Sequence, residues 1–337
     1  MSDRTEELND ATEKTEAPPA PARAGLGSRV RGARNLGLVL ALVLLVIIGS
    51  VTSDAFLQWS NIVTILTLAS VIGVISIGVT FVITGGGIDL SVGSVMGLAT
   101  VWCTTVATQS YGPWVMALCA ILVGLGCGLV NGILIAYGDL VSFIVTLAML
   151  VAAQGLAELI SHRESQLLTQ PALSDLLFTR ILGLPIIVFI FAVVAVVGWF
   201  LLNRTTFGAR TIAVGGNREA ARFAGINVRR HTMILYVLSG FCVGIAAIMT
   251  VAQTNTGAST LGTLYELDAI AAVIVGGTLL SGGRGTIVGT VLGVLVFTTI
   301  TDIFILNELN SPIQKLAKGA IIVAAVLLQR RTQKSSK

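Results

Sequence analysis

The chain is 337 residues long, and only 11% of these are Asp, Glu, Lys or Arg, whereas a soluble globular protein has about 25%. Hydrophobic residues make up 54%, and no Lys or Arg occurs between Arg34 and Arg163. At roughly 20 residues per membrane-crossing helix, that gap can hold about five crossings. The composition excludes a soluble enzyme, a nucleic-acid-binding protein and a disordered protein. We therefore expect an all-α polytopic membrane protein.

Residues 1–35 differ in composition from the rest of the chain. They contain a proline-rich run at 17–21, six acids and six bases, and they have too little apolar sequence to form a core. We expect them to form a disordered cytoplasmic tail. Residues 331–337 are predicted to form a short cytoplasmic tail at the other terminus.

Between these tails, residues 36–330 are predicted to form one transmembrane domain of about ten helices, some of them short or broken by glycine. Ten apolar segments indicate the helices. They are roughly 36–53, 61–84, 90–109, 114–137, 142–161, 184–203, 231–253, 267–280, 286–304 and 312–329.

The basic residues gather in three places: before the first segment, after the last one, and in the loop of residues 204–230. Positively charged loops remain in the cytoplasm, and an even number of crossings puts both termini on one side. All three clusters therefore predict cytoplasmic termini. An intramembrane enzyme would need His, Asp or Glu at depth, but His162 and His231 lie at segment ends. An ion-driven secondary transporter would need paired charges within its helices, and only Asp302 is a plausible mid-segment acid.

The first motif is TGGGIDLSVGS at residues 84–94. Three consecutive glycines cannot continue a stable helix, so the backbone must open near a membrane face. Asp89 and Ser91 then lie where a new helix begins, and either side chain can cap it. The alternative is that the break acts as a hinge or lines a translocation path, since an acid near lipid is a functional candidate.

The second motif lies in the loop of residues 204–230, which holds six arginines and a single acid. Asn217 is predicted to cap a short helix that begins at Arg218, and Gly225 is predicted to end it. One interpretation is a basic loop on lipid headgroups. We favour a helix that docks on a partner, because a purely topogenic loop needs no such helix signals. The residues expected to contact that partner are Asn217, Arg218, Glu219, Ala220, Ala221, Phe223 and Gly225.

The third motif, residues 266–286, has two acids at the start of a short apolar segment and a glycine run around Arg284 at its end. No Lys follows these glycines, and the chain has neither a phosphate-binding GxxxxGK[ST] loop nor a complete GxGxxG. No CxxC or HExxH motif occurs either. We therefore expect no catalytic residue, no metal site and no cofactor bound by this chain.

Together, several ordered motifs resemble the membrane permease subunit of bacterial ABC importers of the ribose/xylose-type monosaccharide family, over roughly residues 36–330. These motifs are TGGGIDLSVGS, Asn131-Gly132, FIVTL at 143–147, AVGGNREAARFAGI and DAIAAVIVGGTLLSGGRGT. The resemblance implies a multi-pass protein of the bacterial cytoplasmic (inner) membrane that acts as a homodimer. It also implies an ATPase pair that holds ATP-Mg and docks on the 217–225 helix, and a periplasmic or lipid-anchored sugar-binding protein that delivers the substrate. No nucleic acid is expected as a partner.

The resemblance has two departures. Glu219-Ala220-Ala221 followed by Gly225 is similar to the EAA-x3-G signature of ABC importers, but no Pro follows it, and Val141-Ser142 stands where relatives often carry a Pro. A branched-chain amino-acid permease is the nearest alternative, although AVGGN and LSGGRG favour a sugar. Pentoses, hexoses, polyols and inositol-like compounds all remain possible substrates. Eight polar residues are candidates for the translocation path, although each can instead satisfy a neighbouring helix: Asp89, Ser91, Asn131, Ser142, Thr146, Gln154, Asp268 and Thr278.

Overall fold

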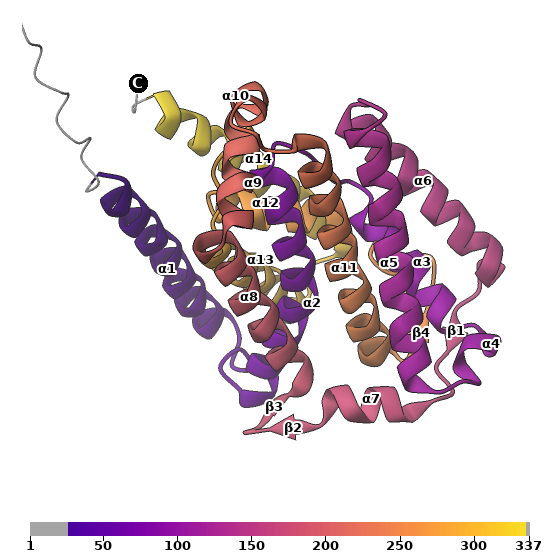
Figure 1. The fold of residues 1–337 in the computed structure, drawn as a ribbon. Coiled ribbons are helices and arrows are strands. Elements are labelled where there is room, and N and C mark those ends of the chain that lie inside the picture. Colours follow the sequence, from indigo (N-terminus) through magenta and orange to yellow (C-terminus); the bar gives the residue numbers. More distant parts are fainter. Residues whose placement is uncertain (1–25, 335–337) are drawn as a thin grey trace, which may run out of the picture.

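The computed structural model describes residues 26–334 and is mostly helical (Figure 1). Within this range, seven helices are long and apolar enough to cross a membrane. The predicted class, an all-α polytopic membrane protein, is confirmed. The seven are α1 (Leu26–Thr52), α2 (Trp59–Thr84), α5 (Pro113–Ala136), α6 (Ser142–Ser161), α8 (Ile186–Arg204), α11 (Val228–Thr254) and α13 (Ile287–Leu306).

The other helices are mostly shorter. They are α3 (Val92–Cys103), α4 (Val106–Gln109), α7 (Pro171–Phe178), α9 (Thr206–Gly216), α10 (Arg218–Phe223), α12 (Tyr265–Val275) and α14 (Ser311–Lys334). The predicted segment 90–109 is therefore two helices. They separate at Thr105, whose side chain caps α4 by accepting a hydrogen bond from the amide of Thr108 at 3.2 Å.

The boundaries of the predicted tails also differ from those in the structure. α1 begins at Leu26, ten residues before the predicted segment, because extending an existing helix avoids the cost of nucleation. The rest of the predicted N-terminal tail, residues 1–25, lies outside the described residues. α14 continues to Lys334, and residues 335–337 also lie outside the described range.

Four two-residue strands form two antiparallel pairs: β1 (Gln166–Leu167) with β4 (Thr256–Gly257), and β2 (Arg180–Ile181) with β3 (Leu184–Pro185). They lie with α4 and α7 at one end of the bundle, here named the α7 end. The helices α9 and α10 lie at the opposite end, the α10 end, where α1 begins (Figure 1). The bundle therefore has two structurally different ends.

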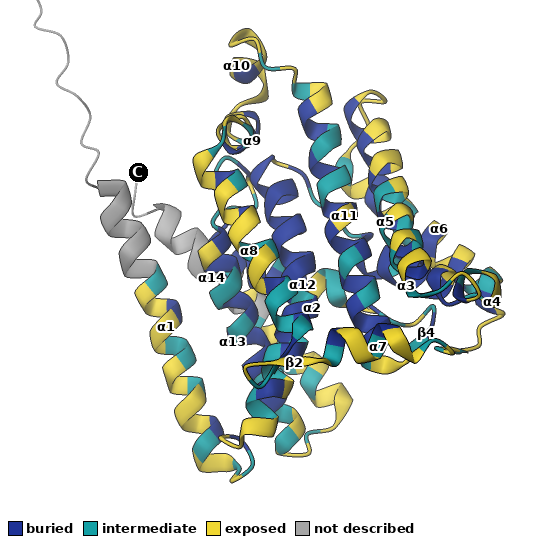
Figure 2. Cartoon of the chain, turned by 60° about the horizontal axis from the view of Figure 1, so that its bottom comes forward, coloured by how far each residue is buried: buried dark blue, intermediate teal, exposed yellow. Residues whose placement is uncertain are grey.

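The core is built around α2 and α11, which Figure 2 shows as the most continuously buried helices, while α1, α6 and α8 carry exposed faces. The helices α5 and α11 approach closely at glycines. A Cβ atom at Gly124 would meet the carbonyl of Gly240, and one at Gly244 would lie 2.6 Å from the Cα of Ile121. Small residues at such spacing allow helices to pack backbone to backbone in lipid.

The helix α3 has 12 residues, about 18 Å at 1.5 Å per residue, which is shorter than a hydrocarbon core of about 30 Å. A non-helical stretch, residues 255–264, runs along it. A Cβ atom at Gly97 of α3 would lie 2.9 Å from the carbonyl oxygen of Ser259 and 3.0 Å from that of Leu261. Because of this close approach, the stretch and α3 form one layer. Irregular backbone at membrane depth is tolerated where protein buries it in this way.

Candidate functional site

The segment of residues 85–91 begins where α2 ends. Gly86 has a φ of +82°, and the amide of Gly87 donates to the carbonyl of Val82 at 3.0 Å. This is the geometry of a glycine that stops a helix in the left-handed conformation. The triple glycine therefore ends α2 as the sequence predicts, and residues 87–91 run non-helically into α3.

Asp89 ties this segment to a neighbouring helix. The residue is 3% exposed. Its Oδ1 accepts hydrogen bonds from the amide and the hydroxyl of Ser91 at 3.0 and 2.7 Å, and its Oδ2 accepts one from the hydroxyl of Ser239 on α11 at 3.0 Å. Ser91 occupies the N-cap position of α3, but its hydroxyl makes no capping bond. Capping of α3 by the Ser91 side chain, one of the alternatives from the sequence, is therefore not present, because the Ser91 oxygen accepts a hydrogen bond from Nδ2 of Asn131 and not from an amide of the helix.

Two further helices hold the same segment. Asn131 of α5 donates from Nδ2 to the Ser91 hydroxyl at 3.0 Å. On α6, the hydroxyl of Ser142 accepts from the amide of Ile88 at 3.3 Å, and Thr146 donates to the carbonyl of Ile88 at 3.4 Å. Hydrogen bonds therefore hold segment 85–91 to three helices, α5, α6 and α11.

Five of the eight predicted path residues meet around this segment: Asp89, Ser91, Asn131, Ser142 and Thr146. Sequence reasoning missed two members of the cluster, Ser239 and Tyr236, both on α11; the Tyr236 hydroxyl donates to the carbonyl of Ile88 at 3.2 Å. Their only sequence signal is that they are polar residues three apart inside an apolar helix.

The other three predicted path residues lie elsewhere. Gln154 is exposed on α6, 3.4 Å from the carboxylate of Glu158. Asp268 on α12 pairs with Lys318 of α14, with 2.8 Å between carboxylate and ammonium. Thr278 is fully buried in the loop after α12, where its hydroxyl accepts from the amide of Thr286 at 3.3 Å. The structure does not bring these three together with the Asp89 cluster.

At the α10 end, three glycine-rich turns touch through their backbones. The amide of Gly283, in the loop after α12, donates to the carbonyl of Thr84 at the end of α2, at 2.9 Å. Gly215 of α9 lies between them: a Cβ atom there would meet the Thr84 carbonyl and lie 2.6 Å from the Gly283 nitrogen. We name this contact of Thr84, Gly215 and Gly283 the glycine junction.

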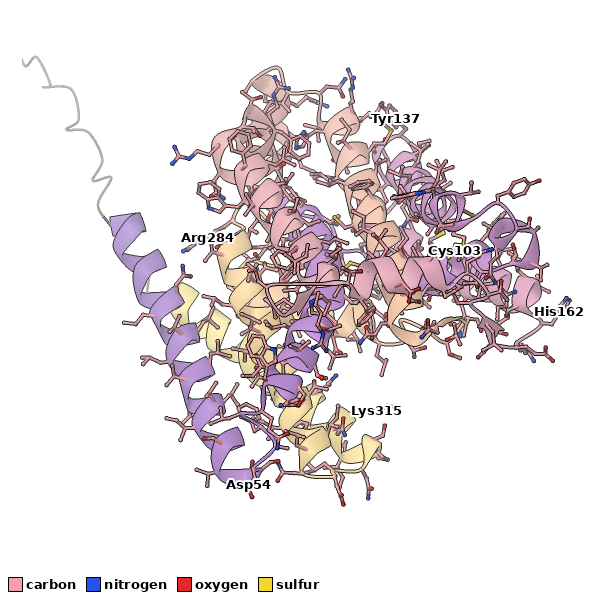
Figure 3. All side chains as sticks on the ribbon, turned by 90° about the horizontal axis from the view of Figure 1, so that it is seen from below. Asp54, Cys103, Tyr137, His162, Arg284 and Lys315 are labelled. Carbon is pink, nitrogen blue, oxygen red and sulfur yellow. The ribbon has the colours of Figure 1, made fainter. Side chains whose placement is uncertain are left out.

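Arg284 follows the glycine junction in sequence. Its carbonyl accepts from the amide of Leu279 at 3.0 Å and closes the loop after α12. Figure 3 shows Arg284 on the side of the bundle where α1 lies. The glycine junction therefore joins α9 to two non-helical segments of the bundle, residues 85–91 after α2 and residues 276–286 after α12.

The predicted helix after Asn217 is present as α10. The side chain of Asn217 accepts from the amide of Ala220 at 3.0 Å, as a capping residue does. At the other end Gly225 has a φ of +79°, and the amide of Ile226 donates to the carbonyl of Ala221 at 3.1 Å. The predictions of the start and the end of this helix are confirmed.

The helix α10 projects from the α10 end of the bundle (Figures 1 and 2). Phe223 is 80% exposed, and the guanidinium carbon of Arg222 lies 5.8 Å from its ring centroid. Of the residues predicted to contact a partner, only Ala221 is buried. A large exposed aromatic side chain on a well-capped helix is typical of a protein contact surface.

Comparison with known proteins gives a consistent picture. The family model described as "Branched-chain amino acid transport system / permease component" matches residues 61–326. The chain is 37% identical to the ribose import permease protein of Bacillus subtilis, covering 88% of this chain and 93% of that protein. It is 33% identical to the L-arabinose ABC transporter permease protein of Azospirillum brasilense, covering 97% and 98%.

A third relative is the D-allose transport system permease protein of Escherichia coli K12, at 31% identity over 87% of this chain and 90% of that protein. No solved structure matches the chain significantly. The match covers the helices from α2 into α14, the Asp89 cluster, the glycine junction and α10. The chain therefore belongs to the family of permease components that is described by the branched-chain amino acid transport system.

Proposed function

We propose that the chain is the membrane-spanning permease subunit of an ATP-binding-cassette importer for a monosaccharide or related polyol. The observation that carries the proposal is the similarity, over 87–97% of the chain, to permeases named for ribose, L-arabinose and D-allose. A branched-chain amino acid, which the family description names, is the weaker alternative. The three relatives are named for sugars and not for an amino acid.

The proposed topology has ten crossings. Seven are the long apolar helices, and α3, α12 and α14 supply the others. Support comes from the non-helical backbone that lies beside α3 and follows α12, since it adds protein to the layers that these short helices occupy. We propose that the α10 end faces the cytoplasm, with both termini there, and that the α7 end faces outward across a bacterial inner membrane. The excess of arginine in the loop of residues 204–230 supports this orientation.

The proposed partners follow from the two ends. A pair of ATPase subunits would bind the exposed face of α10, and a sugar-loaded binding protein would contact the α7 end. A second copy of the permease would complete the translocation path. ATP-Mg on the ATPase supplies the driving energy, and this chain contributes neither cofactor nor catalytic residue.

The proposed coupling route is short. A displacement of α10 moves α9, because one residue, Asn217, both ends α9 and caps α10. Gly215 in the last turn of α9 leaves no room for a Cβ atom between Thr84 and Gly283, so the same displacement reaches the end of α2 and the loop after α12. The break at 85–91 and the loop at 276–286 then change position together. Because this contact is backbone on backbone, no flexible side chain absorbs the motion.

The test is Glu219→Arg in the transporter reconstituted with its ATPase and binding protein. We expect at least a tenfold loss of sugar-stimulated ATP hydrolysis and of uptake, because the reversed charge lies on the exposed face of α10. Asp54→Arg, an exposed acid in the loop between α1 and α2, is the charge-matched control and should retain both activities.

Two outcomes would contradict the proposal. One is full sugar-stimulated hydrolysis and uptake by Glu219→Arg, which would remove α10 from the coupling route. The other is uptake by the wild type that stops with proton or sodium ionophores and needs no ATPase, which would indicate a secondary transporter.

A further inference from the structure

An apolar groove of about 480 Å³ lies between α8 and α11, with α2 as its floor. Every residue that lines it is apolar, Gly or Cys. Val193 and Val197 of α8 border it and are 61% and 50% exposed, and Phe241 of α11 borders it at 38%. In a membrane this groove faces lipid, because α8 and α11 are both long apolar spans.

Beyond the α10 end of the groove, α9 packs against the first turn of α11. The Thr211 hydroxyl of α9 and Nε2 of His231 on α11 lie 2.9 Å apart, and the rings of Phe207 and His231 have centroids 4.8 Å apart. These contacts fix α9 against the first turn of α11. A chain in the groove would therefore end beneath α9 and the last turn of α8.

Two arginines stand at that end. Arg204, the last residue of α8, follows Val197 by seven residues, two helical turns, so its backbone position is on the groove side of the helix, one turn beyond Leu201, a residue of the groove. Its guanidinium carbon lies 5.7 Å from the Trp199 ring centroid, and Trp with Arg at a helix end is typical of the headgroup level. Arg210 immediately precedes Thr211. Both arginines are exposed, and neither forms an ion pair with any residue in the described range.

A second apolar groove shows that this combination is not general. It has a volume of about 510 Å³ and lies between α3, α5 and α6. These three helices lie in the part of the sequence that has no Lys or Arg. Of the two grooves, only the one between α8 and α11 has arginines near its end that form no ion pair within residues 26–334.

We propose that the groove between α8 and α11 binds one acyl chain of an anionic phospholipid, whose phosphate group is held by Arg204 and Arg210. The apolar lining suits the chain, and two guanidinium groups at headgroup level suit the negative charge. The proposal rests on the membrane placement of these helices. It does not depend on which substrate is transported, so its failure would leave the proposed function intact.

The experiment is native mass spectrometry of the purified full-length chain, titrated with phosphatidylglycerol and with phosphatidylcholine of the same acyl chains. We expect the wild type to prefer phosphatidylglycerol. One basic residue near the membrane surface strengthens the binding of an anionic lipid about fivefold. The double variant Arg204→Gln with Arg210→Gln removes two such residues and should therefore weaken phosphatidylglycerol binding about 30-fold. Binding of phosphatidylcholine should not change.

Matched controls distinguish lipid binding in this groove from a general attraction of anionic lipids to basic residues. Arg218→Gln with Arg222→Gln removes the same charge from α10 and should leave lipid binding unchanged. Val197→Trp should fill the groove and weaken binding of both lipids, whereas Val196→Trp, at a 66% exposed position that does not line the groove, should not. Val193→Trp provides a second groove-filling variant if Val197→Trp does not fold.

Three results would overturn the proposal. The first is an equal loss of phosphatidylglycerol binding in the two arginine pairs. The second is the same lipid affinity in Val193→Trp or Val197→Trp as in Val196→Trp. The third is cross-linking between Val197→Cys positions of two copies in native membranes, which would assign the groove to a second permease.

Discussion

At the scale of single residues, the buried polar contacts converge on Asp89. Its carboxyl group accepts three hydrogen bonds from two serines, one in its own segment and one on α11. A polar group buried in a membrane domain needs partners, since each unsatisfied group is costly there. Asp89 therefore fixes the non-helical segment after α2 to α11, and Asn131 extends that attachment to α5.

This attachment predicts different effects for two buried serines. Ser239→Ala removes the only described donor to Oδ2 of Asp89 and should lower the free energy of unfolding by about 1–3 kcal/mol. Ser76→Ala should be nearly neutral, because the Ser76 hydroxyl has no hydrogen-bond partner among the described residues. Thermal unfolding of both variants in one detergent is the measurement. Equal melting temperatures would show that the Ser239–Asp89 bond contributes nothing.

At the scale of elements, the glycine junction connects α9 to the end of α2 and to the loop after α12. These three segments are far apart in sequence, yet Thr84 and Gly283 share a hydrogen bond beside Gly215. The contact explains why consecutive glycines occur in all three segments at the α10 end: side chains there would separate the backbones. The junction makes α9 the link between α10 and the bundle.

Gly215→Ala is predicted to impair this link. The added Cβ atom would collide with the Thr84 carbonyl, and overpacking of this kind costs about 1–3 kcal/mol. We expect sugar-stimulated ATP hydrolysis and uptake to fall together in the reconstituted transporter. Gly216→Ala is the matched control, since the nearest atom to its Cβ is the Cα of Gly283 at 3.9 Å. Indistinguishable activities of the two variants would exclude the junction from coupling.

At the scale of the whole molecule, the two ends of the bundle differ in kind. The α7 end is closed by paired strands and by Gln109, whose side chain donates to the carbonyls of Thr104 and Leu167 and accepts from Thr169. The α10 end exposes arginines and Phe223. One end is tied together by hydrogen bonds and the other presents a projecting helix, as expected of a protein with different partners on its two sides.

The proposed orientation makes a labelling prediction. Leu182→Cys at the α7 end, a 90% exposed position, should react with a membrane-impermeant maleimide in intact cells. Phe223→Cys should react only after the membrane is opened. The four native cysteines lie in apolar helices, and the parent protein measures their background. Labelling of Phe223→Cys in intact cells would reverse the orientation.

Local signals in the sequence predicted local structure well. Asn217 and Gly225 frame α10 because a cap and a left-handed glycine act within a few residues of chain. The triple glycine predicted the end of α2 for the same reason. Of the polar residues chosen as path candidates, five assemble around one segment. Their role in transport stays a prediction.

Contacts between distant parts of the chain were not predictable. The attachment of Asp89 to Ser239 and the glycine junction each join residues more than 60 positions apart, and no periodicity encodes such a pairing. The helix α9 was missed because it lies in the basic stretch of residues 204–230 and ends in two glycines, which is also typical of a loop. The predicted segment 90–109 merged α3 with α4 because only two threonines separate these helices, and α12 ends at Val275, before the predicted end at residue 280, because Gly276 and Gly277 follow it.

The self-contained build of α10 has a consequence for how the molecule can change over time. The helix carries its own start and stop signals, and Ala221 is its only buried residue. The exposed residues of segment 217–225 can therefore be substituted, or the whole segment replaced by another capped helix, without a change in the packing of the bundle. A permease built in this way can acquire a new partner subunit through a few surface substitutions, while the membrane domain keeps its specificity.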